Sequence, residues 1–252
     1  MSAAASLPPD TKPGTLLGGR VRYAQKVEGH RSGIEPVLLA AATPARPGAR
    51  VLEAGCGAGA ALLCLAARIP GLVGLGIERD AALVALARAN AAANGFNALR
   101  FETGDIEIHD GPTGGHEAPF DHAIANPPWH DARGTQGPDA ARETARRGRP
   151  GLIGAWTRNL AARLRPRGTL SLIVATHALP ESMAAFAAAA IGSPRLIPLW
   201  PRAGQEAKLV ILQGVRSGRG AMAVAPGLVL HEADGRFTPA AEAVLREGTT
   251  LR

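Results

Sequence analysis

The chain has little cysteine, few aromatic residues and no long apolar run. Its two cysteines, Cys56 and Cys64, lie close together in a stretch rich in glycine and alanine, which excludes a disulfide framework and favours reduced, buried thiols. No apolar run approaches the length that a membrane-spanning helix needs. The opening residues MSAAASLPPDTKPG lack the basic start and apolar core of a secretory signal, so we expect a cytoplasmic protein.

Lysine is also scarce, yet the chain is strongly basic. Of 28 basic residues only three are lysines, namely Lys12, Lys26 and Lys208. The formal net charge is +7 and the isoelectric point is about 10.6. Because guanidinium groups bind phosphates as planar forks, this arginine-rich balance favours a polyanionic partner such as a nucleic acid.

The length of 252 residues suits one large domain. Residues 1–14 are small, polar and rich in proline, which predicts a disordered tail. Residues 15–48 predict an entry segment, with a hairpin or loop first and a short helix over 35–42. We expect residues 15–252 to form a single domain.

Beyond the entry segment, patterns typical of strands and helices alternate. This alternation predicts an α/β fold with a doubly wound sheet and helices on both faces. Strands are predicted over 49–54, 72–78, 99–103, 120–125, 169–175, 195–200, 208–214 and 228–231, and helices over 60–68, 80–94, 152–164, 181–190 and 239–246. Asp80 is the predicted N-cap of the second of these helices.

The segment VLEAGCGAG, residues 51–59, places a buried strand against a tight turn and then a helix. Glycines at alternate positions let the backbone approach a ligand, and the helix start offers free N–H groups. The pattern also fits a dinucleotide site, but the acid Glu53 would repel a pyrophosphate and suits a ligand bearing an amino group and a sulfonium. Ligand contacts are predicted at Glu53, Ala54, Gly55, Cys56, Gly57 and Gly59.

Acids also follow the next two predicted strands. Glu78 ends the second strand, where its carboxylate can accept hydrogen bonds from two ribose hydroxyls. Asp105 follows the third strand, where it can accept from the exocyclic amine of an adenine while Ile106 packs on the ring. The order of these residues predicts a nucleoside ligand with a cationic tail.

The most specific motif is Asn126-Pro127-Pro128-Trp129, directly after the fourth strand. The prolines fix φ and remove N–H donors, so the strand end presents carbonyls rigidly. The Asn126 side chain and the Pro127 carbonyl can accept both hydrogens of a planar amino group, which raises the nucleophilicity of its nitrogen. Trp129 offers a face for a flat base or amide. These four residues are predicted to be catalytic, with Asn126 also beside the ligand.

On this signature the sequence resembles the class I S-adenosylmethionine-dependent methyltransferases that act on amino groups, over about residues 15–250. More narrowly, the stretch LLGGRVRYAQKVEGHRSGIEPVLLAAA resembles the entry segment of the valine-tRNA adenine-N6 methyltransferase family. Two residues depart from that family's pattern. Trp129 replaces the usual tyrosine, so the resemblance does not define the exact base pocket. Glu35 replaces the usual aspartate.

The resemblance implies a Rossmann-like class I methyltransferase fold, with a seven-stranded mixed sheet whose last hairpin is reversed. It implies S-adenosyl-L-methionine as cofactor, bound by Glu53, the 55–59 loop, Glu78 and Asp105. It also implies methyl transfer to adenine N6 of an RNA, most simply a tRNA, at residues 126–129.

Two clusters of arginines follow the motif and are expected to flank the catalytic strand end, where an RNA-phosphate role and an ordinary solvated surface stay equally open. His130 and Asp131 beside Trp129 suggest a metal, but no third ligand has a plausible spacing, so no metal is expected. The arginines are Arg142, Arg146, Arg147 and Arg149 after the motif, and Arg163, Arg165 and Arg167 at the end of the next helix.

Three other functions compete with RNA methylation. A protein glutamine methyltransferase of the release-factor type uses the same Asn-Pro-Pro chemistry, but it usually carries a helical N-terminal domain that the loop-like first 48 residues do not predict. A catalytically silent RNA-binding module would not need the glycine turn, Glu78 and the motif together. A nicotinamide dehydrogenase explains neither Glu53 nor the motif. The sequence does not indicate an oligomeric state.

Overall fold

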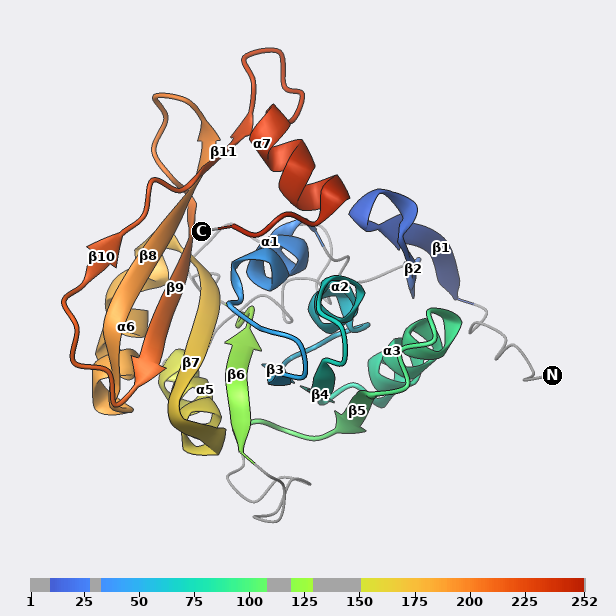
Figure 1. The fold of residues 1–252 in the computed structure, drawn as a ribbon, viewed down its shortest axis with the longest axis horizontal. Helices are drawn as coiled ribbons and strands as arrows, with labels where there is room; N and C mark the ends of the chain where they lie inside the picture. Colours follow the sequence, from blue (N-terminus) through green and yellow to red (C-terminus); the bar gives the residue numbers. More distant parts are fainter. Residues whose placement is uncertain (1–9, 28–32, 108–118, 129–150, 252) are drawn as a thin grey trace.

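The computed structural model describes residues 10–27, 33–107, 119–128 and 151–251 (Figure 1). The described chain begins with an antiparallel hairpin, β1 (Thr11–Leu16) and β2 (Val21–Lys26), joined by the short turn η1 (Leu17–Gly19). The predicted tail is therefore too long, because the backbone of residues 11–14 pairs with β2 despite its polar, proline-containing composition. Residues 1–9 lie outside the described part.

Strands and helices then alternate as predicted. Most ends agree within two residues, but β7 starts five residues earlier than predicted and the last helix divides into α7 and a π-type turn. The elements are α1 (Glu35–Ala42), β3 (Arg50–Ala54), α2 (Ala60–Arg68), β4 (Val73–Glu78), α3 (Ala81–Ala93), β5 (Leu99–Thr103), β6 (Phe120–Ala125), α5 (Leu152–Arg163), β7 (Leu164–Ala175), η2 (Thr176–Ala178), α6 (Leu179–Ala188), β8 (Ile191–Arg202), β9 (Leu209–Arg216), β10 (Ala223–Val224), β11 (Leu228–His231), α7 (Pro239–Glu242) and η3 (Ala243–Glu247).

The long strands form one mixed sheet in the order β5-β4-β3-β6-β7-β9-β8. Neighbours are parallel from β5 to β7, whereas β9 runs antiparallel to both β7 and β8. The predicted fold class and the reversed final hairpin are confirmed. Within the described residues the sheet has nine strands rather than seven, because the short β10 and β11 both pair with the outer edge of β8.

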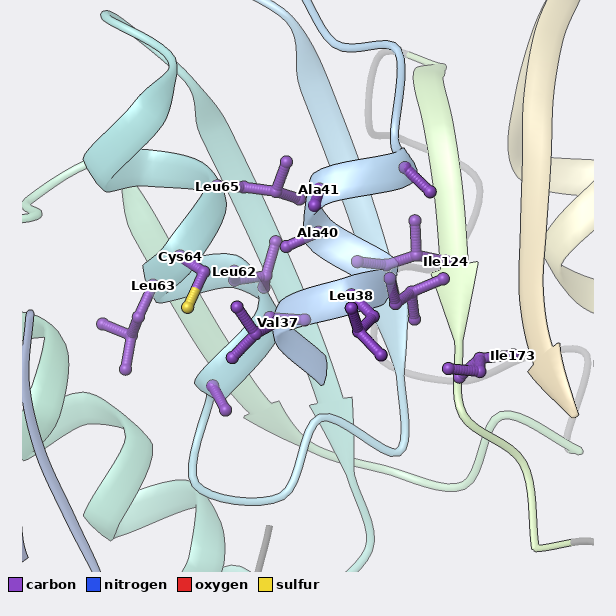
Figure 2. Packing of buried hydrophobic residues seen from close by; sticks show 14 of the residues in the cluster. Val37, Leu38, Ala40, Ala41, Leu62, Leu63, Cys64, Leu65, Ile124 and Ile173 are labelled. Atoms are coloured by element: carbon purple, nitrogen blue, oxygen red, sulfur yellow. The ribbon is translucent and has the colours of Figure 1, made fainter. Parts of the chain in front are cut away.

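Helices cover both faces of the sheet and bury two cores. Because side chains alternate along a strand, Val51 of β3 faces one core and Leu52 faces the other. Figure 2 shows the first core, in which Leu38 of α1 and Leu62 of α2 pack with Ile124 of β6. Helices α5 and α6 cover the second core. Glu53 shares a face with Val51, which places a carboxylate beneath α2.

The N-terminal hairpin is held on α3 by two asparagines. Asn90 accepts from Ala24 N (2.8 Å) and donates to Ala24 O (2.9 Å), and Asn94 makes the same pair of hydrogen bonds with Arg22 (2.8 and 2.7 Å). Residues four apart share one face of a helix. The two side-chain amides therefore bind the backbone N–H and C=O groups of β2 in the way that a neighbouring strand would. At the far end of β2, Lys26 forms an ion pair with Asp80 at 2.9 Å.

Candidate functional site

The strand register brings four predicted features to one edge of the sheet. Ala54, the last residue of β3, pairs with Ile77 on one side and with Ala125 on the other. Glu78 in turn pairs with Thr103 at the end of β5. The glycine turn, the acid Glu78, the loop containing Asp105 and the Asn126 motif therefore all leave the sheet at its carboxyl edge, where open α/β sheets bind their ligands.

The glycine turn is tied to the end of β4. The amides of Gly55 and Cys56 both donate to Ile77 O, at 2.8 and 3.2 Å. Gly55, Gly57 and Gly59 all have positive φ, at 62°, 54° and 88°, a region that side chains disfavour. A Cβ at Gly57 would meet no atom within 4 Å, so the space beside this turn is open to a ligand.

The Glu78 carboxylate joins the turn to the start of α3. One oxygen accepts from Gly57 N at 3.1 Å and the other from Asp80 N at 3.0 Å. Asp80 caps α3 as predicted, by accepting from Ala82 N at 2.8 Å. A carboxylate can accept about four hydrogen bonds, so half-buried Glu78 retains acceptor capacity for ribose hydroxyls.

Glu53 lies below the turn rather than on its open side. It is only 5% exposed, and its Oε2 accepts from Leu62 N at 3.3 Å in the first turn of α2. Burial raises the pKa of Glu53 to about 8, with a further contribution from the negative charge of Glu78. A cationic ligand at the turn would therefore meet an acid that is held neutral when no cation is near.

The two cysteines are buried structural thiols. Cys56 is 5% exposed, and a Cβ on Gly76 would lie 2.7 Å from its Sγ, so the thiol packs against β4. Burial raises the pKa of Cys56 well above its ordinary value and that of Cys64 to about 12. Only the backbone of Cys56 belongs to the open turn.

Asp105 and Ile106 have different environments. The Asp105 side chain is half-buried and accepts from Glu107 N at 2.9 Å. Ile106 is 4% exposed and belongs to the core beneath α5. Asp105 is thus available to a base, whereas Ile106 mainly anchors the loop.

The Asn126 motif follows β6 directly. Asn126 and Pro128 are partly exposed and Pro127 is buried, so the strand continues from the core into a rigid Pro-Pro segment at the carboxyl edge. The last pair of the β3–β6 register is Ala54 with Ala125, so the glycine turn and Asn126 each begin one residue after that pair. Trp129, His130 and Asp131 lie outside the described residues.

Sequence reasoning missed the contribution of α5. Trp156 lies directly against the glycine turn, because a Cβ on Gly55 would be 2.7 Å from its indole ring. One turn later, buried Asn159 donates to the carbonyls of Ile106 (2.6 Å) and Glu107 (3.0 Å). The only sequence signal was a tryptophan and an asparagine three residues apart in an apolar helix, which α5 turns to the same face.

The arginines after α5 do not flank the motif, contrary to our expectation. Leu164 pairs with Phe120, the first residue of β6, whereas Asn126 follows the last. Because α5 runs back across the sheet before β7 begins, Arg165 and Arg167 lie at the opposite, amino edge. The cluster Arg142, Arg146, Arg147 and Arg149 lies outside the described residues.

The described part of the chain holds neither a metal-binding cluster nor a membrane-spanning helix. Within the residues that the structure describes, no group of three or more histidine, cysteine, aspartate or glutamate side chains could hold a metal ion. No helix described here is both long and apolar enough to cross a membrane.

A sheet with this strand order, carrying a glycine turn over a buried acid and a second acid at the neighbouring strand end, defines the class I methyltransferases. The open space at Gly57 and the acceptor capacity of Glu78 fit S-adenosylmethionine. The chain is a methyltransferase of this class, and S-adenosylmethionine is its cofactor.

Comparison with known proteins identifies the family. The family model of the methyltransferase small domain matches residues 35–186. The chain is 31% identical over 224 residues to the tRNA1(Val) (adenine(37)-N6)-methyltransferase of Aeromonas hydrophila, covering 86% of this chain and 87% of that one. It therefore belongs to the methyltransferase small domain family.

Two further similarities agree with this result. The enzyme of the same name from Tolumonas auensis is 29% identical over 220 residues, with coverage of 86% of this chain and 87% of that one. The crystal structure of a predicted O-methyltransferase from Agrobacterium tumefaciens superposes with a TM-score of 0.68 at 23% identity, covering 86% of this chain and 97% of that chain. This second likeness concerns the fold.

Proposed function

We propose that the protein transfers a methyl group from S-adenosylmethionine to the N6 amino nitrogen of an adenine in tRNA. The observation that supports the proposal is the β3–β6 register, in which Ala54 pairs with Ala125, so that the glycine turn and the Asn126 motif leave the sheet from the same pair of residues. The two relatives named for adenine-N6 methylation of tRNA support the choice of substrate.

Three acids and the turn would hold the cofactor. Glu78 would accept from the ribose hydroxyls while its two existing hydrogen bonds fix its orientation. Asp105 would accept from the adenine amine. Glu53 would complement the positive charges of the methionine end from below the turn, and Gly57 would leave room for the ligand.

The substrate amine would be oriented by Asn126 and Pro127. When bound, S-adenosylmethionine supplies an electrophilic methyl group. Asn126 Oδ1 and the Pro127 carbonyl would accept the two amine hydrogens, which directs the nitrogen lone pair towards that methyl. The amine nitrogen held in this way would take the methyl group as its bond to sulfur breaks, and would then release a proton to solvent. Positioning and charge complementarity supply most of the rate.

The target base must leave its stack before its amine can reach this edge. Trp129 would hold the extruded ring by stacking, an interaction that typically contributes about 1–3 kcal/mol. Tryptophan and tyrosine both offer a flat aromatic face for stacking. Trp129 would therefore do what the usual tyrosine does in similar enzymes.

The test is single-turnover methyl transfer to tRNA at saturating cofactor. Asn126→Ala should slow the reaction by about two to three orders of magnitude, the usual effect of removing one preorganised polar group, with little change in cofactor affinity. Asn97→Ala, in the exposed turn before β5, is the matched control and should retain the wild-type rate.

Two results would contradict the proposal. A wild-type rate in folded Asn126→Ala would remove the motif from the chemistry. Label found in glutamine side chains of protein, with none in digested RNA, would make the enzyme a protein methyltransferase instead.

A further inference from the structure

Charged side chains are distributed unevenly between the two edges of the sheet. Acids gather at the carboxyl edge, where the cofactor site lies. At the amino edge, around the starts of β6 and β7 and the end of β9, Asp121 is the single acid among the described residues. The acids of the carboxyl edge are Glu53, Glu78, Asp80, Asp105, Glu107, Glu181 and Glu206.

Four arginines define what we call the arginine edge: Arg165, Arg167, Arg216 and Arg219. Arg165 forms an ion pair with Asp121 at 2.6 Å, and Arg216 donates to the carbonyls of Ala162 and Leu164 at the end of α5. Arg167 and Arg219 are exposed, and neither has a partner among the described residues. Two of the four are thus structural, and two present free guanidinium groups to solvent.

A bulge pushes Arg167 outward. Phe120 pairs with Leu164, but His122 pairs with Thr169, so residues 165–168 stand opposite the single residue Asp121, three more than a regular ladder needs, and residues 165–167 are exposed. Arg167 itself has a φ of 66°, a left-handed conformation that costs a non-glycine residue about 1 kcal/mol or more. Arg165 anchors the base of the bulge through Asp121, which also accepts from Arg50 N at 2.7 Å.

A groove opens beside Arg219. It has a volume of about 570 Å³ and lies between the end of α6 and the start of β8. Met183, Phe186 and Pro194 give it an apolar lining, and Arg219 also lines it. A nucleotide suits a guanidinium group beside an apolar groove, because its phosphate can bind the guanidinium and its base can pack in the groove. An acidic protein surface would use only the guanidinium.

We propose that the arginine edge binds phosphates of the substrate RNA, so that the RNA contacts the protein at both edges of the sheet. The identity of that RNA rests on the proposed function. The edges are separated by strands of five to six residues, or roughly 20 Å, a distance that a folded tRNA spans easily. Exposed Arg158 on α5 lies between the two edges.

This arrangement gives the two edges different tasks. The carboxyl edge carries the acids of the cofactor site, and their charge disfavours RNA phosphates close to that site. Since binding of phosphates supplies most non-specific affinity, placing it at the other edge lets one small sheet bind both a cation and a polyanion.

The decisive variant is Arg167→Glu combined with Arg219→Glu. Arg22→Glu combined with Arg100→Glu is the matched control, because it makes the same change in net charge at exposed positions on β2 and β5. Binding of bulk tRNA is titrated from low to moderate salt for both variants and the wild type, independently of methylation. Cofactor affinity and steady-state methylation are measured alongside.

We expect the arginine-edge variant to bind tRNA at least about tenfold more weakly at moderate salt. The slope of log affinity against log salt should fall by about two, one for each phosphate that no longer meets an arginine. KM for tRNA should rise while kcat and cofactor affinity stay at wild-type values, and the control should resemble the wild type.

Two outcomes would overturn the inference. Equal weakening in both variants would make net charge responsible rather than this edge, and unchanged tRNA binding in the arginine-edge variant would show that RNA does not bind there. Failure of the proposed function looks different, because the wild type would then transfer no methyl group to RNA whatever the binding titrations show.

Discussion

The fold strongly changes the ionisation of Glu53. It is buried beneath the glycine turn, and the hydrogen bond from Leu62 N only partly offsets the loss of hydration. The pKa therefore rises from 4.5 to about 8, so the folded protein holds a proton that the unfolded chain releases between these values. The contribution of Glu53 to stability is complete below pH 4.5 and is lost as the pH rises through 8.

This shift predicts opposite effects of Glu53→Gln on stability and on cofactor binding. The amide retains an acceptor for Leu62 N and never ionises, so the variant should be more stable than the wild type at pH 8 and about equally stable near pH 4.5. Chemical denaturation at the two pH values tests this. A variant less stable than the wild type at pH 8 would show that the buried carboxylate does not destabilise the folded protein at that pH.

Cofactor binding should respond in the other direction. The positive charges of S-adenosylmethionine favour ionised Glu53, so wild-type binding should release a proton below pH 8 and affinity should rise with pH. In Glu53→Gln this part of the pH dependence should disappear, and the affinity should be lower. Calorimetry in two buffers of different ionisation enthalpy counts the protons, and equal counts in both proteins would place Glu53 outside the reach of the ligand charge.

At the scale of elements, α3 connects the N-terminal hairpin to the cofactor site. Asn90 and Asn94 bind β2 in the same way, but Asn90 also donates to Ala58 O at 3.0 Å, inside the glycine turn. Asn90 is 1% exposed, so water cannot replace its three hydrogen bonds. The hairpin and the turn therefore share one buried amide.

The two asparagines form a natural pair of variants. Asn90→Ala should lower the free energy of unfolding by roughly 3 kcal/mol, since three buried groups lose their partner, and should weaken S-adenosylmethionine binding in the folded protein. Asn94→Ala should reduce stability less and leave cofactor affinity unchanged. Denaturation and calorimetric titration measure both quantities, and equal affinities in the two variants would show that the hydrogen bond to Ala58 does not shape the turn.

At the scale of the whole molecule, Arg68 holds the C-terminal segment on the helical layer. Its guanidinium group donates to Gly248 O (2.7 Å), Ala40 O (2.6 Å) and Thr250 Oγ1 (3.2 Å). Leu251, 6% exposed, completes the attachment by donating to Ala41 O at 2.9 Å. One arginine thus joins α1, α2 and the last residues of the described chain.

Arg68→Ala should lower the free energy of unfolding by about 2–4 kcal/mol, because charge-assisted hydrogen bonds to half-buried groups disappear together. Arg68→Lys should restore little of it, since an ammonium group cannot reproduce the planar fork. Arg46→Ala, an exposed arginine in the loop before β3, controls for the charge and should be nearly neutral. If Arg68→Ala unfolds at the wild-type denaturant concentration, the hydrogen bonds of Arg68 do not stabilise this attachment.

The sequence by itself determined the alternating strands and helices, the glycine turn, the helix cap at Asp80 and the fold class. These features depend on local patterns, such as side-chain periodicity, positive φ at glycine and capping by aspartate, which neighbours in the chain largely decide. The family resemblance followed because its motifs lie at strand ends in a set order.

The tertiary structure alone decided which residues meet. Trp156 and Asn159 are about a hundred and about fifty residues from the loops they contact, and only the return of α5 across the sheet brings them there. The same return placed Arg165 and Arg167 at the amino edge, although the chain order suggested the catalytic edge. Strand register and helix direction depend on long-range packing. Proximity in sequence to the motif therefore placed Arg165 and Arg167 at the wrong edge of the sheet.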